Sequence, residues 1–212
     1  MLDNMTTDAS ATHASGAPPT VAPDGITETT DPYCLPDGEA AALLAGTSWA
    51  RFASIGDSLS AGTSDPSPGY RTLPWPDRVR GVLQLVNPEL AYLNTAEIGA
   101  TTRRAIASQA ERILDFAPDL LHLPSGANDI FRPEPSFERI EDDLGELYGL
   151  GADTGATLTA FTFVKRFVVP TIPDFSERVS RVNAITRRLA AEHGVILIDM
   201  CGITRSTIAR TC

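Results

Sequence analysis

The stretch FASIGDSLSAG, residues 52–62, joins an apolar run to a polar loop that contains glycine. The apolar half has the composition of a buried strand, and it ends abruptly at Asp57-Ser58. A serine at such a place is either a helix cap or a nucleophile held at the rim of a sheet. The pattern of the remaining chain decides between these two roles.

From Ala50 onward, short apolar runs alternate with segments of helical length. The strand-like runs are RFASI (51–55), LAYLNTA (90–96), DLLHLPS (119–125), TLTAFTFV (157–164) and VILIDM (195–200). The helical segments are 73–86, 101–117, 137–151 and 175–194. In the last segment, Val179, Val182, Ile185 and Leu189 recur at three- and four-residue steps. This alternation predicts βαβ units and therefore an α/β fold, in which a five-stranded parallel sheet carries helices on both faces.

The composition bounds the class of protein and its partners. The formal net charge of −10 argues against nucleic acid or an anionic membrane surface as the main partner, because both would repel the molecule. No apolar run approaches the roughly 20 residues that span a bilayer. Cys34, Cys201 and Cys212 are odd in number and lack zinc-ligand spacing, so we expect neither a disulfide framework nor a structural zinc site. The composition leaves the oligomeric state open.

The chain divides into one folded domain and two terminal segments. Residues 1–46 are rich in small and polar side chains, so we expect a disordered tail with a short helix near 38–46. The first residues lack the basic and apolar regions of a secretory signal, which predicts a cytoplasmic protein. The domain spans 47–200, and 201–212 form an atypical tail.

Polar loops that contain glycine follow the first three strand-like runs. They are Gly56-Asp57-Ser58, Gly99-Ala100-Thr101-Thr102 and Gly126-Ala127-Asn128-Asp129. Because the carboxyl ends of parallel strands meet at one edge of a sheet, these loops should converge. A serine with bare backbone N–H groups and an amide nearby makes a nucleophile with an oxyanion hole. Taken singly, the same residues are explained as a cap, a turn glycine and a turn asparagine.

The segments GDSLSAG (56–62), IGATT (98–102) and GANDI (126–130) resemble, in order, three blocks of the SGNH or GDSL hydrolases. The resemblance runs from about Phe52 to Met200. It implies a flavodoxin-like three-layer α/β/α sandwich and the activity of a carboxylic-ester hydrolase, an esterase or lipase acting on a small-molecule ester without a metal or organic cofactor. It also implies that Ser58 is the nucleophile, and that Gly99 and Asn128 belong to the oxyanion hole.

The family's general base comes from a carboxyl-terminal Asp-x-x-His that this sequence lacks. Asp199 is followed three residues later by Gly202, and no histidine comes after it. We expect structural roles for His122, in a presumed central strand, and for His193, at a helix end. Loss of a triad histidine lowers turnover on the order of 10⁶-fold, so we predict a strongly impaired enzyme. We hypothesise that 201–212 result from a frameshift or truncation.

Two alternative functions stay open at this point. One is a non-catalytic SGNH-like domain that binds an ester, acyl group or sugar, and the other is a flavodoxin-like binding or signalling domain. The G-x-S-x-G elbow of ordinary α/β-hydrolases is absent, and GLGADTG (149–155) lacks the spacing of a dinucleotide-binding loop. We expect Asp57 and Asp129 to be capping carboxylates, and 65–76 to form part of the pocket rim, with Trp75 packing against the neighbouring prolines.

Overall fold

The computed structural model describes residues 25–63, 66–164 and 169–201. Within them, helices and strands alternate as the sequence predicts, with one additional short helix after the first strand. The elements are α1 (Asp37–Leu43), β1 (Arg51–Ser54), α2 (Ser58–Ala61), α3 (Trp75–Val86), β2 (Ala91–Asn94), α4 (Thr102–Phe116), β3 (Leu120–His122), α5 (Phe137–Asp153), β4 (Thr157–Phe161), α6 (Phe175–Glu192) and β5 (Ile196–Ile198).

The five strands form one parallel sheet in the order β2-β1-β3-β4-β5. In the centre, Phe52 of β1 pairs with Tyr92 of β2 on one side and with Leu120 of β3 on the other. This order belongs to the doubly wound folds, in which ligands bind beyond the carboxyl ends of the strands where the winding reverses. The loop with Ser58 follows β1 and the loop with Asn128 follows β3, so the two loops flank this reversal.

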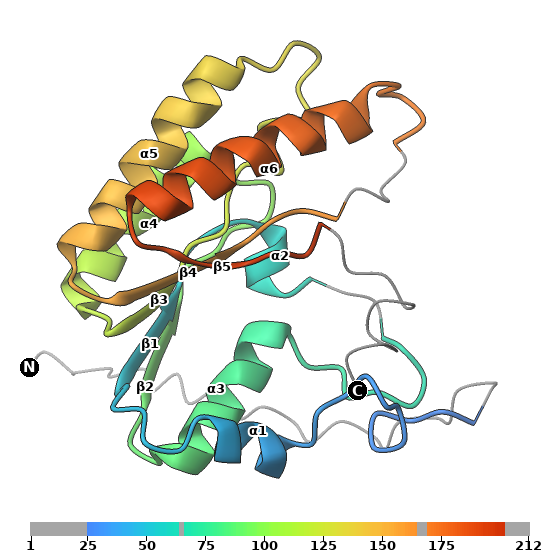
Figure 1. Cartoon of the computed structure of the whole chain (residues 1–212), viewed down its shortest axis with the longest axis vertical. Coiled ribbons are helices and arrows are strands. Elements are labelled where there is room, and N and C mark those ends of the chain that lie inside the picture. Colours follow the sequence, from blue (N-terminus) through green and yellow to red (C-terminus); the bar gives the residue numbers. More distant parts are fainter. Residues whose placement is uncertain (1–24, 64–65, 165–168, 202–212) are drawn as a thin grey trace, which may run out of the picture.

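Helices cover both faces of the sheet, which confirms the three-layer α/β/α architecture (Figure 1). Helices α4, α5 and α6 lie on one face and enclose the larger apolar core. The spacing predicted for α6 is visible here, since Val179, Val182 and Leu189 are all buried in this core. Helix α3 lies on the other face with α1 beside it, and a smaller core joins α3 to β1 and β3 through Leu83, Phe52 and Leu120.

Among the described residues, only one face of the edge strand β5 is well covered. Leu197 packs against the core beneath α6, whereas Ile196 and Ile198 point the other way and are 57% and 47% exposed. Parallel strands are usually covered on both faces, so this part of the sheet departs from the ordinary pattern.

The described part of the amino-terminal segment, residues 25–46, differs from the disordered tail that its composition predicts. Helix α1 lies against α3, and it ends at Leu43, three residues before the predicted Gly46. Ion pairs from Glu28 and Asp37 to Arg71 join this segment to the domain. Composition could not reveal these pairs because their partners lie 34 to 43 residues away in the sequence.

Other predictions fall partly or wholly on residues that the structure does not describe. Residues 1–24, including His13, and most of the atypical tail, 202–212, lie outside the described ranges. Cys34 and Cys201 carry free thiols, while Cys212 is not described. Within the described ranges, no helix has the length and apolar character needed to cross a membrane.

Candidate active site

The first loop of the site turns directly from β1 into the single turn of α2. Asp57 is the N-cap, since its Oδ1 accepts a hydrogen bond from the N–H of Leu59 at 2.9 Å. Ser58 is therefore the first helical residue rather than the cap, and its side chain borders a pocket. Because α2 has only four residues, its helix dipole adds little to the stabilisation of an anion at this end.

Gly56 holds this loop in a conformation that a side chain would obstruct. Its φ is +149°, and a Cβ atom built on it would lie 2.7 Å from the carbonyl oxygen of Pro124. The fully buried side chain of Gln109 fixes the same residue, because its Oε1 accepts from Gly56 N at 3.0 Å and its Nε2 donates to Gly56 O at 2.9 Å. The sequence signal for Gln109 is a polar residue among the apolar positions of α4.

Asn128 links the three polar loops to one another. Its Nδ2 donates to the Asp57 carboxylate at 3.2 Å and to the Ala100 carbonyl at 2.9 Å. The neighbouring carboxylate of Asp129 accepts from the N–H and the hydroxyl of Thr102, at 2.9 and 3.0 Å. These contacts confirm that the loops converge at one edge of the sheet, and that Asp57 and Asp129 act as capping and loop carboxylates.

Only two of the three predicted site residues line the pocket. Ser58 and Asn128 both line it, whereas Gly99 is not among its lining residues. Gly99 is exposed at a turn with φ +76°, one residue before the Ala100 carbonyl that Asn128 contacts. Both amide hydrogens of Asn128 already have protein acceptors, so one must be exchanged before this amide can donate to a ligand oxygen.

Burial disfavours the charged form of the carboxylate beside Ser58. Asp57 is 2% exposed, and its removal from water raises the pKa of its carboxyl group. The nearby carboxylate of Asp129 acts in the same direction, while the hydrogen bond from Leu59 N opposes the increase. The site therefore stabilises a neutral Asp57 relative to an exposed aspartic acid.

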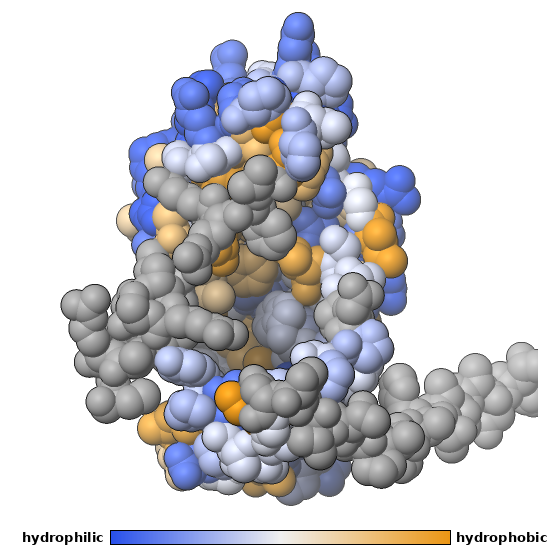
Figure 2. Space-filling model, turned by 90° about the vertical axis from the view of Figure 1, so that its right-hand side faces the viewer, coloured by the Kyte–Doolittle hydropathy of each residue, from blue (hydrophilic) through white to orange (hydrophobic). Residues whose placement is uncertain are grey.

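The pocket has a volume of about 570 Å³ and mostly apolar walls. In Figure 2 the side of the molecule that carries α2 is hollowed between the two helical layers, with apolar side chains in and around the hollow. No described lining residue is a lysine or arginine. The lining residues are Asp57, Ser58, Leu59, Trp75, His122, Ala127, Asn128, Ile130, Phe131, Phe161, Thr162, Phe163, Val164, Phe175, Val179, Ile198 and Met200.

His122 is a hydrogen-bonded core residue, as predicted, but it also borders this pocket. It is 2% exposed, and its Nδ1 lies 2.9 Å from the Thr159 hydroxyl. Its Nε2 is buried and has no hydrogen-bond partner among the residues that the structure describes, and burial lowers the pKa of the imidazole to about 3. The imidazole packs against both Trp75 and Phe161, with ring-centroid distances of 4.6 and 5.3 Å, and these two rings also contact each other.

The described residues place no general base in contact with the Ser58 hydroxyl. None of the described side chains hydrogen-bonds to the Ser58 hydroxyl. His193 lies at the end of α6 near Tyr148, in agreement with its predicted structural role. The described residues also contain no group of three or more histidine, cysteine or carboxylate side chains placed to hold a metal ion.

Comparison with known proteins gives one family and several related folds. The model of the GDSL-like lipase/acylhydrolase family matches residues 54–211. No curated protein matches the chain. Similar solved structures include an α/β hydrolase from the metagenome of Lake Arreo, Spain, at 21% identity and a TM-score of 0.59, covering 79% of this chain and 81% of that one.

Two further structures share the fold at similar distance. The acetylxylan esterase Axe2 from Geobacillus stearothermophilus has 19% identity and a TM-score of 0.58, covering 79% of this chain and 80% of its own. The lipase/acylhydrolase from Enterococcus faecalis has 21% identity and a TM-score of 0.55, covering 71% of this chain and 75% of its own.

Proposed function

The chain belongs to the GDSL-like lipase/acylhydrolase family, and on this premise we propose that it is an SGNH-type carboxylic-ester hydrolase acting through an acyl-enzyme on Ser58. The observation that carries the proposal is the convergence of the three polar loops beside an apolar pocket that Ser58 and Asn128 both border. This arrangement offers a hydroxyl and an amide to the same bound molecule.

In the proposed reaction, the Ser58 oxygen adds to the carbonyl carbon of the ester. The carbonyl oxygen becomes an anion that the N–H groups of Ser58 and Gly99 and the amide of Asn128 stabilise, each donor contributing about 3 kcal/mol in the transition state. Collapse of the intermediate expels the alcohol, which takes up the serine proton. Water then attacks the acyl-enzyme in the same way and releases the carboxylic acid.

The proposal includes slow turnover. Since no described histidine contacts Ser58, proton removal from the serine falls to weaker acceptors such as water. Loss of the base alone lowers turnover on the order of 10⁶-fold, and the oxyanion donors leave some 10³-fold over water. A single acylation event is consequently easier to detect than steady hydrolysis.

The pocket supports a small, uncharged ester as the substrate. Its walls contain the aromatic rings of Trp75, Phe131 and Phe161, and its described lining offers no cation for an anionic group. A short-chain or medium-chain acyl group therefore fits this lining better than a phosphorylated or carboxylated one. The cytoplasmic location stays a prediction.

A non-catalytic domain that binds esters is the second candidate. It is favoured by the two protein acceptors that occupy the Asn128 amide and by the absence of a described base at Ser58. In this case an ester would bind in the same pocket without transferring its acyl group.

Acylation of Ser58 separates the two candidates. The protein is mixed with p-nitrophenyl butyrate, the burst of p-nitrophenol is recorded, and the chain is weighed by mass spectrometry. A butyryl adduct on the parent that Ser58→Ala loses supports the hydrolase. The matched control is Ser60→Ala, which removes a fully buried hydroxyl from the same short helix and should leave the adduct intact. Binding of the ester without any adduct would reject acyl transfer.

A further inference from the structure

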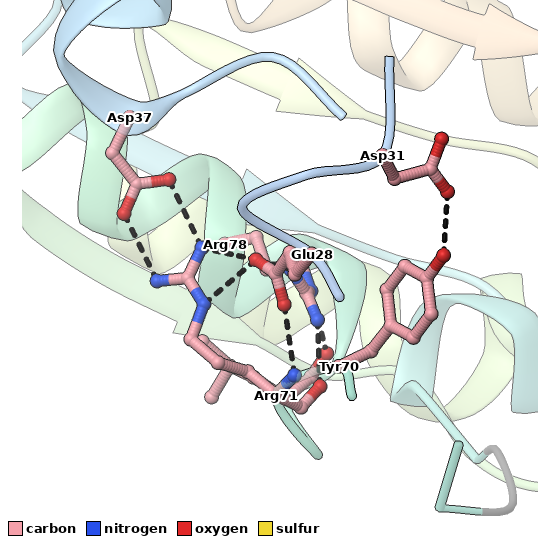
Figure 3. Close-up of polar contacts among 7 residues, drawn as sticks. Glu28, Asp31, Asp37, Tyr70, Arg71 and Arg78 are labelled. Atoms are coloured by element: carbon pink, nitrogen blue, oxygen red, sulfur yellow. Dashed lines mark hydrogen bonds and ion pairs between the residues drawn. The ribbon is translucent and has the colours of Figure 1, made fainter. Parts of the chain in front are cut away.

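An ionic cluster joins the amino-terminal segment to the loop that leads into α3 (Figure 3). At its centre, one carboxylate oxygen of Glu28 accepts from Arg71 Nε at 2.8 Å and from Arg78 Nη1 at 2.5 Å. The other oxygen accepts from the backbone N–H of Arg71 at 2.8 Å. Arg71 also pairs with Asp37 through both terminal nitrogens, at 2.9 and 3.0 Å.

The cluster holds the backbone of the loop as well as its side chains. Arg78 donates to the carbonyl groups of Arg71, at 2.6 Å, and Leu73, at 3.1 Å, so it fastens residues 71–73 to the first turn of α3. The Glu28 N–H donates to the Gly69 carbonyl at 2.9 Å. Glu28 thus sets the position of the loop and offsets the repulsion between two neighbouring guanidinium groups.

The same loop ends at Pro74 and Trp75, which both contact α2. The Trp75 indole N–H donates to the Leu59 carbonyl at 2.8 Å, one residue after Ser58. Pro74 packs so closely on Gly62 that a Cβ atom at Gly62 would lie 2.1 Å from the Pro74 Cβ atom. Trp75 also forms a wall of the pocket and packs edge-on against His122.

We propose that Glu28 is a positioning residue for the candidate active site: through Arg71 and Arg78 it holds Trp75 against α2 and so fixes the pocket wall beside Ser58. This inference rests on the proposed function for its catalytic consequence. We call the contacts of Glu28 with Arg71 and Arg78 the clamp. The exposure of Trp75 can be measured without any ester, so the clamp is testable independently of acyl transfer.

The electrostatics fit a clamp that is charged at every ordinary pH. The Glu28 side chain is only 15% exposed, and burial alone would raise the pKa of its carboxyl group. Hydrogen bonds from Arg78 and Arg71 outweigh burial and lower this pKa to about 2. Glutamine at position 28 keeps the shape of the side chain but removes the charge that both guanidinium groups face.

The experiment uses the full chain with Trp49→Phe, which leaves Trp75 as the single tryptophan. Acrylamide quenching of Trp75 is measured in this parent and after Glu28→Gln, with circular dichroism to verify folding. We expect quenching to increase several-fold in Glu28→Gln, because a loosened loop exposes the indole. Asp37→Asn, which breaks only the outer pair of Arg71, should give a smaller increase and remains informative if Glu28→Gln does not fold.

The matched control is Arg103→Ala on the opposite face of the sheet. Arg103 of α4 joins Asp143 and Glu146 of α5, so its removal breaks another ion-pair cluster without touching the loop before α3. Trp75 quenching should not change in this variant. Unchanged quenching in folded Glu28→Gln, or an equal increase in Arg103→Ala, would overturn the proposal.

A second measurement tests the consequence for the pocket. Acylation by p-nitrophenyl hexanoate and p-nitrophenyl acetate is followed over a range of ester concentrations. Glu28→Gln should raise the half-saturating hexanoate concentration by roughly tenfold, the factor that one charge-assisted hydrogen bond provides. The acetate value should change less, because a short acyl group contacts less of the wall. No acylation by the parent would reject the proposed function and leave the quenching result to decide on the clamp.

Discussion

Replacement of Gln109 by leucine tests whether the loop before Ser58 depends on one buried amide. Leucine has a similar volume but cannot bond to Gly56. The change removes two hydrogen bonds to Gly56, of 3.0 and 2.9 Å, and a longer one of 3.4 Å from the Thr95 hydroxyl, all made by a side chain with no exposed surface. The Gly56 carbonyl keeps a second donor, the N–H of Glu97 at 3.1 Å, whereas the Gly56 N–H loses the Gln109 oxygen, its one side-chain acceptor among the described residues.

The magnitude follows from these contacts. The two lost hydrogen bonds to Gly56 are worth about 1 kcal/mol each, and one buried N–H is left unpaired, so we predict a loss of roughly 2–4 kcal/mol in the free energy of unfolding. The long bond from Thr95 adds little, because its hydroxyl keeps the Ser54 carbonyl as an acceptor at 3.3 Å. Urea denaturation followed by circular dichroism measures this loss. Ser108→Ala is the matched control, since the exposed Ser108 hydroxyl donates to the Arg104 carbonyl of its own helix, and its loss should change the free energy of unfolding by less than about 0.5 kcal/mol.

Gln109→Leu should also reduce acylation of Ser58 by more than its loss of stability explains. With Gly56 no longer fixed, Asp57 and Ser58 lose their alignment, and acylation by p-nitrophenyl butyrate should fall even under conditions where the variant is fully folded. A stability loss below about 1 kcal/mol, or full acylation by the folded variant, would refute the reasoning.

Further substitutions probe the contact with Pro74 and the buried imidazole. Gly62→Ala should lower the free energy of unfolding by roughly 2–4 kcal/mol, because φ is +79° and the new Cβ atom overlaps Pro74. The control is Gly155→Ala, at φ +74° in open space, which should lower it by only about 1–2 kcal/mol. Thermal or urea unfolding measures both changes. The pKa of His122 is lowered from 6.5 to about 3, so between these values the unfolded chain binds a proton that the folded chain does not, and stability falls as the pH decreases. His122→Leu should therefore show a smaller decrease in melting temperature from pH 7 to pH 4.5 than the parent, and an equal decrease would contradict this account.

Periodic apolar patterns were sufficient for most of the fold. The stripe of Val179, Val182 and Leu189 predicted the buried face of α6, and the apolar runs located all five strands of the sheet. Helix α2 has a single turn, which is too short to show a period. The sequence pattern therefore did not predict it, although Asp57 was expected to be a capping carboxylate.

The site was only partly predictable because its supporting contacts join distant residues. The loop pattern located Ser58 and Asn128 at one pocket, but nothing local indicated that the Asn128 amide donates to Asp57 and Ala100. Glu28 lies among polar residues that resemble a tail, and its role depends on arginines 43 and 50 positions later. Such pairings depend on tertiary structure, whereas the patterns of strands and helices can be recognised within a short stretch of sequence.

One face of β5 is left partly exposed by the described residues, and it bears on how copies of this protein meet. Ile196 and Ile198 offer branched apolar side chains along a strand whose backbone edge lacks a neighbour among the described strands. Such an edge is a template for association with another chain. The net charge of −10 acts against this by repulsion between like molecules. Association between copies of the protein is thus favoured by apolar contacts and opposed by charge repulsion. Added salt should promote association, because counter-ions screen the repulsion but not the apolar attraction.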